Sequence, residues 1–577
     1  MDLKELRKRL SPTKIQDHDS TINEFRPQST PSFLSLTFFA SNITKTFSAL
    51  LIVLPVFVIF ALIHRNPNHS DRSFSLFADA RVLDDKSSSH GSLNISTKHV
   101  EVPDAKLLGG LLSSGFDEAS CSSRYQSYMY RKTSPFKPSS YLLSKLRKYE
   151  ELHSQCGPGT QSYTNALKQL QSDSTTASSA DCKYVVWMAY SGLGNRILTL
   201  AAAFLYALLS DRVLLVDPGT DMPDLFCEPF PRTSWFLPRD FPLNDQFTGF
   251  NQKSPKCHGY MLKNKKLNAT AQSIPSYLYL HLGHDYNDHD KLFFCDHDQS
   301  LLSKVPWLIM KTDNYFVPSL FLIPSFEQEL SNLFPEKVTI FHHLGRYLFH
   351  PTNQVWGLIT RYYDAYLANA DERIGLQIRT FEDTPGPFQH VKDQIQSCIS
   401  NEKLLPEISK DDSGFTSSKN QKSIAVLVTS LNSGYYENLR DLYWEYPTVK
   451  GEMVGFYQPS HEGYQKSEKT MHTMKAWAEM YLLSLSDKLV TSAWSTFGYV
   501  GQGLGGLKPW ILHKPEDEKA PDPPCVRAMS IEPCFHAPPF WDCKAKTGID
   551  TGNLVPHVRH CEDMTWGLKV VDGHDEM

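Results

Sequence analysis

The stretch Lys488-Leu-Val-Thr-Ser-Ala-Trp-Ser-Thr-Phe-Gly-Tyr-Val-Gly-Gln-Gly-Leu-Gly-Gly-Leu-Lys-Pro-Trp-Ile-Leu512 decides the fold class. Short apolar runs at its two ends enclose a small-polar turn and a glycine-rich segment, an order that predicts strand, loop, short helix and strand. Ser495 and Thr496 stand where this helix would begin, so their hydroxyls would cap it. Its free N–H groups would attract a phosphate. The alternative is an ordinary capped turn of an α/β sheet.

The chain upstream alternates in the same way. Apolar runs predict strands at residues 184–190, 212–216, 305–310, 373–379, 424–428 and 453–457. Helical periodicity predicts helices at residues 141–152, 197–208, 388–400, 435–444 and 471–486. Such repeats build parallel sheets with right-handed crossovers. Two such sheets, one before and one after Trp356, predict a bilobal α/β protein with a cleft between its lobes. Residues 226–306 and the tail from residue 521 show little periodicity.

Length and charge limit the classes of function. A chain of 577 residues is too long for one core, so we expect two or more domains. Its formal net charge is −5, without a long basic run after residue 10. Nucleic acid is therefore not an expected partner.

The N-terminal region predicts a membrane anchor. Residues 47–63 carry no charge and are mostly Leu, Ile, Val and Phe, with Pro55 among them. This is the short end of what spans a bilayer. A buried core helix is the alternative. We expect a cytosolic tail at residues 1–45, an anchor at 46–64 and a stem at 65–105, with the rest of the chain on the far side.

Cysteines and glycosylation motifs agree with a luminal body. All eleven cysteines follow the anchor, and no C-x-x-C motif occurs among them. Several disulfides in an oxidising compartment are therefore expected, with at least one cysteine left over. Asn94 and Asn268 begin N-x-S/T motifs and are candidate glycosylation sites.

Arg379 is the first candidate binding residue. It ends an apolar strand, where an unpaired charge is costly and needs an anionic partner. A structural carboxylate, Glu382 or Asp383, is one candidate partner, and a phosphate held by the guanidinium fork is the other. The turn at Ser495 ends a strand of the same predicted sheet, so both features could face one cleft and hold a diphosphate.

Several runs are similar to the plant xyloglucan fucosyltransferases of the Golgi. They are Lys106-Leu-Leu-Gly-Gly-Leu-Leu, Ser191-Gly-Leu-Gly-Asn-Arg, Lys311-Thr-Asp-Asn-Tyr-Phe, Phe341-His-His-Leu-Gly-Arg-Tyr, Thr491-Ser-Ala-Trp-Ser-Thr-Phe-Gly-Tyr and Val555-Pro-His-Val-Arg-His-Cys-Glu. The resemblance extends from about residue 106 to residue 571. It implies a type II Golgi membrane protein of the GT-B fold, with two Rossmann-like parallel-sheet lobes. Such an enzyme moves fucose from GDP-fucose to a galactose 2-hydroxyl on xyloglucan, with inversion, without a cofactor and without a required metal.

The resemblance also assigns domains and donor-binding residues. The N-terminal lobe on the acceptor side would span residues 106–355, the GDP-fucose lobe 356–520, and a Cys-rich tail packed on both 521–577. The expected donor-binding residues are Arg379, Ser495, Thr496, Phe497, Gly192, Gly194, Asn195 and Arg196. One departure is visible: Glu382 and Thr384 stand where the family has aspartates. The resemblance therefore does not extend to contacts that the family makes through those two aspartates.

Asp313 is the candidate catalytic base, because it follows a predicted strand at the edge of the cleft. An acceptor-binding or turn-capping role is the alternative, and a reaction that needs only a weak base is another. The acceptor glycan also stays open between xyloglucan, arabinogalactan and other galactose-bearing glycans, as does a homodimer. Three other classes compete with this reading: a metal-dependent transferase using Asp288-His-Asp290 or Asp296-His-Asp298, a zinc hydrolase using His281, His284 and His289, and a non-enzymatic glycan-binding relative.

Overall fold

The computed structural model describes residues 105–172, 182–267, 274–381, 386–410, 421–466, 469–552 and 554–573. The predicted tail and anchor, the predicted stem up to residue 104, both glycosylation motifs, and residues 382–385 lie outside these ranges. In the described part of the chain, no helix combines the length and the apolar character needed to cross a membrane. The described residues belong to one compact unit.

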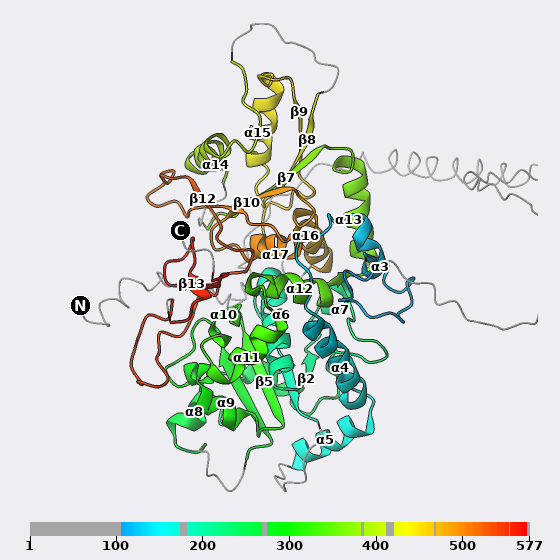
Figure 1. The fold of residues 1–577 in the computed structure, drawn as a ribbon, viewed down its shortest axis with the longest axis vertical. Helices are drawn as coiled ribbons and strands as arrows, with labels where there is room; N and C mark the ends of the chain where they lie inside the picture. The colour runs from blue at the N-terminus through cyan, green and yellow to red at the C-terminus, as the bar shows by residue number, and fades with distance from the viewer. Residues whose placement is uncertain are drawn as a thin grey trace, which may run out of the picture. The chain divides into compact units, whose positions relative to one another are not determined.

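Two sheets organise this unit (Figure 1). The first has four parallel strands in the order β2 (Val213–Val216), β1 (Tyr184–Trp187), β5 (Trp307–Thr312) and β4 (Tyr277–Leu282). The second has six, in the order β12 (Cys525–Arg527), β11 (Trp510–Leu512), β10 (Lys488–Ser492), β7 (Glu372–Gln377), β8 (Ser423–Thr429) and β9 (Met453–Tyr457). All neighbours in the second sheet pair in parallel except β11 and β12. The chain is therefore an α/β protein with two sheets that are mostly parallel.

Helices connect the strands. The longer ones are α4 (Ser140–Cys156), α5 (Gln161–Ser172), α6 (Leu193–Leu209), α11 (Pro324–Leu333), α12 (Ile340–Leu348), α13 (Asn353–Tyr366), α14 (Gln389–Asn401), α15 (Gly434–Glu445), α16 (Thr470–Leu483) and α17 (Thr496–Gly505). Shorter elements are α3 (Ser122–Gln126), α7 (Met222–Leu225), α8 (His258–Lys263), α9 (Asp296–Leu302), α10 (Val317–Leu320), η1 (Ser127–Met129), η2 (Asn244–Gly249), η3 (Asp290–Phe294), η4 (Lys337–Thr339), β3 (Phe226–Cys227), β6 (His350–Pro351), β13 (Val558–His560) and β14 (Leu568–Val570).

The predicted elements are confirmed at nearly every position, with ends shifted by a few residues. The strand–loop–helix–strand order around the opening stretch corresponds to β10, α17 and β11. Two strands of the two main sheets were missed, β4 and β12, and the short strands β3, β6, β13 and β14 were not predicted either. β4 lies in the segment predicted to have little periodicity, although Tyr277-Leu-Tyr-Leu-His-Leu282 is bounded by Pro275 and Gly283, a signal that could have found it. β12 has three residues, too few to give a pattern, and only its pairing with β11 makes it a strand.

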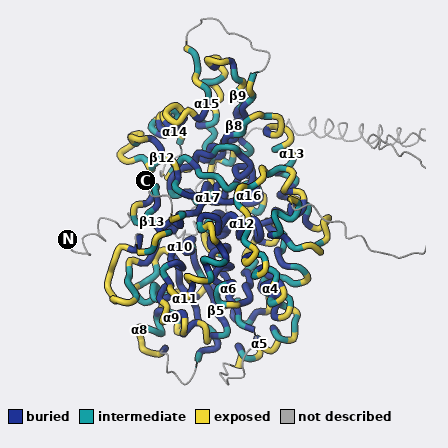
Figure 2. Tube along the Cα trace, in the orientation of Figure 1, coloured by how far each residue is buried: buried dark blue, intermediate teal, exposed yellow. Residues whose placement is uncertain are grey.

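α6 and α17 are buried between other elements. The side chains of α6 are buried on every face from Arg196 to Leu208, as expected for a helix that is apolar all round. α17 contacts α6, α12 and α16, and Figures 1 and 2 show these helices together at the buried centre of the described chain. The starts of α6 and α17 are therefore held by extensive packing, which fixes the loops in front of them.

The predicted disulfides are confirmed, and all eleven cysteines are accounted for. Five bonds form, Cys121–Cys227, Cys156–Cys182, Cys295–Cys543, Cys398–Cys525 and Cys534–Cys561, and Cys257 is free and buried. Cys295–Cys543 and Cys398–Cys525 attach the Cys-rich tail to α9's start and to α14. This agrees with the expectation that the tail packs on the body.

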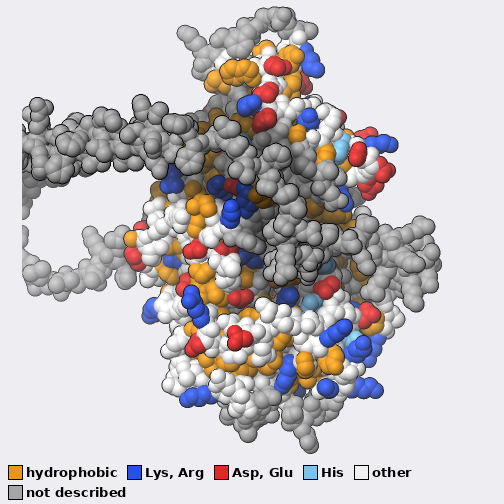
Figure 3. Space-filling view, turned by 180° about the vertical axis from the view of Figure 1, so that it is seen from behind, with side chains coloured by type: hydrophobic (Ala, Val, Ile, Leu, Met, Phe, Trp, Pro, Cys, Tyr) orange, Lys and Arg blue, Asp and Glu red, His pale blue; other side chains and the backbone are white. Residues whose placement is uncertain are grey.

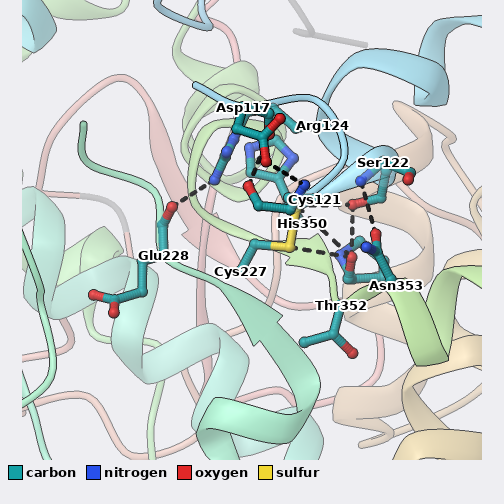
Figure 4. Close-up of a disulfide and its surroundings, with 12 residues drawn as sticks. Asp117, Cys121, Ser122, Arg124, Cys227, Glu228, His350, Thr352 and Asn353 are labelled. Carbon is teal, nitrogen blue, oxygen red and sulfur yellow. Dashed lines mark hydrogen bonds between the residues drawn. A yellow bond between two sulfur atoms is a disulfide. The ribbon is translucent and has the colours of Figure 1, made fainter. Parts of the chain in front are cut away.

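Cys121–Cys227 attaches the N-terminal end of the described chain to β3. Figure 4 shows this bond beside His350, with Arg124 reaching the carbonyl of Glu228 and Ser122 donating to Asn353. The segment is thus fixed by covalent and polar contacts together. On the face of the molecule drawn in Figure 3, acidic and basic side chains are interspersed, as the low net charge indicates.

Candidate active site

A cavity of about 520 Å³ is lined by loops that follow strands of both sheets. They are residues 191–196 after β1, 377–379 and 381 after β7, 429–431 after β8, and 494–497 after β10. Ser460, Glu462 and Gln465 after β9, residues of α16, and His536 of the tail complete the lining. The C-terminal ends of parallel strands are where open α/β sheets bind ligands. All eight predicted donor-binding residues line this one cavity.

Arg379 presents a positive charge to the cavity. It follows β7 by two residues, and its backbone N–H donates to the Ser492 hydroxyl at 2.9 Å. Burial lowers the pKa of its guanidinium, and among the described residues no carboxylate forms an ion pair with it. The centroid of the Phe381 ring lies 5.4 Å from the guanidinium carbon of Arg379. The two candidate structural partners, Glu382 and Asp383, lie outside the described residues, so the choice between a structural carboxylate and an anionic ligand stays a prediction.

The turn between β10 and α17 directs a helix start into the same cavity. α17 begins at Thr496 with Ser495 as its N-cap residue, as predicted, and its first-turn N–H groups have no intrahelical partner. The expected capping hydrogen bond is wrong, because the Ser495 side chain accepts none. The Thr496 hydroxyl instead donates to Asn195. A Cβ on Gly498 would collide with the Thr491 side chain, so only glycine lets α17 pack this closely on β10.

Asn195 joins the loops of the two sheets. Its side-chain oxygen accepts from the Thr496 hydroxyl at 2.8 Å, and its Nδ2 donates to the Asp313 carbonyl at 3.1 Å. A Cβ added to the neighbouring Gly194 would lie 2.6 Å from the Thr496 hydroxyl oxygen. Glycine at position 194 and an amide at position 195 therefore bring the first glycine turn against the start of α17.

Arg196 also lines the cavity, but its charge is already paired. Its guanidinium forms two hydrogen bonds with Asp221, at 2.5 and 3.0 Å, and both side chains are buried. The sequence did not indicate Asp221 as a partner. Since the ion pair holds the guanidinium, Arg196 orients the glycine turn and presents less free charge to a ligand than Arg379 does.

Asp313 lies next to the cavity and is heavily hydrogen-bonded. It follows β5 directly, at the predicted strand end. Its Oδ1 accepts from the His284 backbone N–H at 2.9 Å and from Asn314 at 2.5 Å, and its Oδ2 pairs with His284 Nδ1 at 2.5 Å. Asp313 is not among the residues that line the cavity. Both carboxylate oxygens of Asp313 are therefore engaged by neighbouring groups.

Sequence reasoning missed an acidic wall of the cavity. Glu479 on α16 is buried, accepts from the Ser460 hydroxyl, and burial raises its pKa to about 7. Glu462 pairs with Lys475 at 2.6 Å and Lys466 at 3.0 Å, and these contacts lower its pKa to about 2. A carboxylate inside the apolar run Ala476-Trp-Ala-Glu-Met-Tyr was the available signal for Glu479.

The tail supplies a second group of residues that the sequence did not indicate. His536 lines the cavity, and its Nε2 lies 3.1 Å from the Tyr499 hydroxyl. Tyr499 in turn donates to Asp563 Oδ2 at 2.5 Å. The same carboxylate accepts from the backbone N–H of Trp494 at 3.0 Å, which supports that residue's left-handed backbone (φ 59°). The tail therefore builds part of the cavity wall.

The alternative metal motifs do not line the cavity. Asp288 pairs with Lys291, and the buried Asp298 lies 3.3 Å from His258. Within the described ranges, one group of potential metal ligands comes together, Cys534, Cys561 and Asp563. Its two cysteines form a disulfide, so they offer no thiolate to a metal.

Comparisons with known proteins agree with this geometry. The family model for xyloglucan fucosyltransferase matches residues 80–544. A galactoside 2-alpha-L-fucosyltransferase of Arabidopsis thaliana is 61% identical over 572 residues, covering 99% of this chain and 100% of the relative. The chain belongs to the xyloglucan fucosyltransferase family.

Further members of the xyloglucan fucosyltransferase family show the same likeness. A galactoside 2-alpha-L-fucosyltransferase of Pisum sativum is 67% identical over 473 residues, covering 82% of this chain and 83% of the relative. The solved structure of a mutant of Arabidopsis thaliana FUT1 in complex with GDP is 67% identical, with a TM-score of 0.76. It covers 81% of this chain and all of that one.

Proposed function

We propose that the chain transfers L-fucose from GDP-fucose to the 2-hydroxyl of galactose on xyloglucan side chains, with inversion at the fucose C1. The observation that carries this proposal is the convergence of the Arg379 guanidinium and the start of α17 on one cavity. Two negative charges develop on the GDP leaving group, and both features favour negative charge. Two relatives are named galactoside 2-alpha-L-fucosyltransferases, and these names indicate the transferred sugar and the linkage. The similar FUT1 structure contains GDP, which indicates the nucleotide.

We infer a part for most of the predicted donor-binding residues. Arg379 and the N–H groups near Thr496 and Phe497 would hold the diphosphate and stabilise it as the sugar–phosphate bond breaks. Gly192 and Gly194 let the first glycine turn approach the nucleotide closely, and Asn195 ties that turn to Thr496. This division does not need a metal ion, because fixed protein charges do the neutralising. Asp313, the base that the sequence predicts, lies outside the lining of this cavity, so the base is a separate question from donor binding.

A donor-and-acceptor assay tests the function. The full chain, purified in detergent, is incubated with GDP-fucose and a galactosylated xyloglucan oligosaccharide, and the product linkage is read by NMR. We expect a fucose α-linked to the galactose 2-position. Arabinogalactan and a simple galactoside serve as competing acceptors, and the acceptor with the highest kcat/KM identifies the glycan. Binding of GDP without transfer to any galactoside would instead favour the non-enzymatic relative.

We infer a GT-B arrangement for the two sheets, with acceptor binding by residues 106–355 and donor binding by residues 356–520. Lining residues from loops of both sheets support this inference. A ligand-bound structure with GDP and an acceptor oligosaccharide decides it. Contacts from GDP mainly to the first sheet would contradict the assignment.

We also infer a type II Golgi membrane protein, anchored by residues 46–64 and glycosylated at Asn94 and Asn268. Support comes from the apolar run in the sequence and from five disulfides, which form in oxidising compartments. Protease protection of sealed microsomes, followed by glycosidase digestion, tests orientation and glycans together. Light scattering of the purified chain tests for a homodimer.

A further inference from the structure

His536 occupies a position that neither the sequence nor the donor-binding residues explain. It belongs to the tail, yet it lines the cavity together with Arg379 and Thr496. Its Nε2 contacts the Tyr499 hydroxyl, and for its Nδ1 no hydrogen-bond partner is found among the described residues. Because His536 lines the cavity, Nδ1 is the ring nitrogen left for a ligand there.

The neighbouring hydrogen bonds fix which nitrogen of His536 carries the proton. Tyr499 has one hydroxyl hydrogen, and it donates this hydrogen to the Asp563 carboxylate, which can only accept. The tyrosine oxygen must then accept from Nε2–H of His536. In a neutral imidazole the other nitrogen, Nδ1, is consequently a lone-pair acceptor. The chain Asp563–Tyr499–His536 thus leaves a base facing the cavity.

We propose that His536 is the catalytic base of the transfer reaction and that its Nδ1 takes the proton of the attacking galactose hydroxyl. This proposal rests on the proposed function. The acceptor oxygen forms the bond to the fucose C1 while the bond from C1 to the phosphate oxygen breaks. The bonding electron pair leaves with GDP, the acceptor proton moves to Nδ1, and the imidazolium returns that proton to solvent after product release.

The surroundings of His536 suit a base that is neutral at rest and charged for a short time. Burial lowers the pKa of His536, which favours the neutral ring. The carboxylates of Asp563 and Asp313 oppose part of that shift, and Lys569 adds to it. The two carboxylates would stabilise the imidazolium as it forms, and Tyr499 holds the ring in place through Nε2. This resembles the general arrangement in which an acidic group orients a histidine base.

Substitutions of His536 test the role. His536→Gln places an amide near Nε2 and His536→Asn places one near Nδ1, and neither amide is basic. We expect both to lower kcat by roughly 10²–10⁴-fold with little change in acceptor KM or GDP affinity. His536→Ala should regain part of its activity when imidazole is added to the assay. His560→Gln, in the same tail but outside the cavity, is the matched control and should stay near wild type.

The pH profile separates a base from a purely structural residue. Wild-type kcat/KM should fall towards acid as His536 becomes protonated, and this limb should disappear in His536→Gln. Tyr499→Phe keeps the aromatic packing but removes the hydroxyl that accepts from Nε2–H of His536. The acid limb of the pH profile should therefore shift, and kcat should fall less than in His536→Gln. Normal thermal unfolding of the variants excludes misfolding.

The outcomes distinguish this proposal from the proposed function. If wild-type protein transfers fucose but His536→Gln and His536→Asn stay within tenfold of it, His536 is not the base. An unchanged acid limb, or no rescue by imidazole, leads to the same conclusion. If wild-type protein binds GDP but transfers fucose to no galactoside, the proposed function itself fails.

Discussion

The Thr496 hydroxyl donates a 2.8 Å hydrogen bond to the side-chain oxygen of Asn195, a residue 301 positions earlier in the chain. The other end of the same amide donates to the Asp313 carbonyl. One side chain thus connects the glycine turn after β1, the turn after β5 and the start of α17. The first and third of these segments line the cavity where the donor is proposed to bind. Their relative position depends on this amide and on the close contact at Gly194.

Asn195→Ala should misplace the start of α17 and lower kcat/KM for GDP-fucose by roughly 10–100-fold, because small displacements of binding groups are costly in catalysis. Thr496→Val removes the same hydrogen bond from the other side. Since the two residues act through one contact, the double variant should lose less than the product of the single losses. Steady-state kinetics of all four proteins check this, with Asn165→Ala on α5 as the control. Fully multiplicative losses would contradict the coupling.

Arg379→Ala and Arg379→Lys should each reduce transfer by at least ~100-fold while the protein stays folded. Lysine lacks the planar fork that binds two phosphate oxygens, so the conservative change should not restore activity. Calorimetric titration with GDP should show weaker binding in parallel. Arg440→Ala on α15, an exposed arginine paired with Asp441, is the control. Near-normal turnover by Arg379→Lys would end the diphosphate assignment.

Asp313→Asn separates the two candidate bases. It keeps the shape of the side chain but removes its negative charge. That charge raises the pKa of His536, so this electrostatic effect is lost in the variant. With His536 as the base, we expect a fall of about tenfold in kcat and a shifted acid limb. A fall of roughly 10²–10⁴-fold with an unchanged KM would return the role of base to Asp313.

Removal of divalent metal with EDTA should leave transfer unchanged, because Arg379 and the start of α17 supply the charge that a metal would otherwise provide. Asp288→Ala should also leave activity unchanged, since that side chain is exposed and pairs with Lys291. Asp298→Ala should lower thermal stability without changing kcat, because its buried carboxylate faces His258. A strict requirement for Mn²⁺, lost in either variant, would revive the D-x-D hypothesis.

Glu479 predicts a pH dependence of stability. Burial raises its pKa from an ordinary value of 4.5 to about 7, so the folded state binds this proton more tightly than the unfolded state does. Its contribution to the free energy of unfolding is therefore most favourable below pH 4.5 and is lost as the pH rises through about 7. Glu479→Gln should gain stability relative to wild type across this window, by about 3 kcal/mol at most. Denaturant unfolding at several pH values, without nucleotide, measures the difference.

The donor half of the site could be predicted from the sequence because its residues sit in local patterns. Arg379 follows an apolar strand, and Ser495 and Thr496 precede a short helix, so each position at a strand end was readable from neighbouring residues. The capping hydrogen bond was wrong for a tertiary reason. The Thr496 hydroxyl is directed to the other sheet, where it donates to the Asn195 side-chain oxygen.

The catalytic half could not be predicted in the same way. His536 and Asp563 lie in a tail without periodicity, and nothing near them in sequence marks them as facing a cavity. Their positions follow from the Cys295–Cys543 and Cys534–Cys561 disulfides and from contacts with α17.

The sequence by itself determined the α/β class, the order of strands and helices, the Arg379 and Thr496 positions and, through its motifs, the family. These depend on hydrophobic periodicity and on turn chemistry, which act over a few residues. Only the tertiary structure decided which loops meet, that Asp221 pairs with Arg196, and that a histidine of the tail faces the cavity. Such pairings join residues tens to hundreds of positions apart, and their geometry is set by how the helices and sheets pack, which no local pattern encodes.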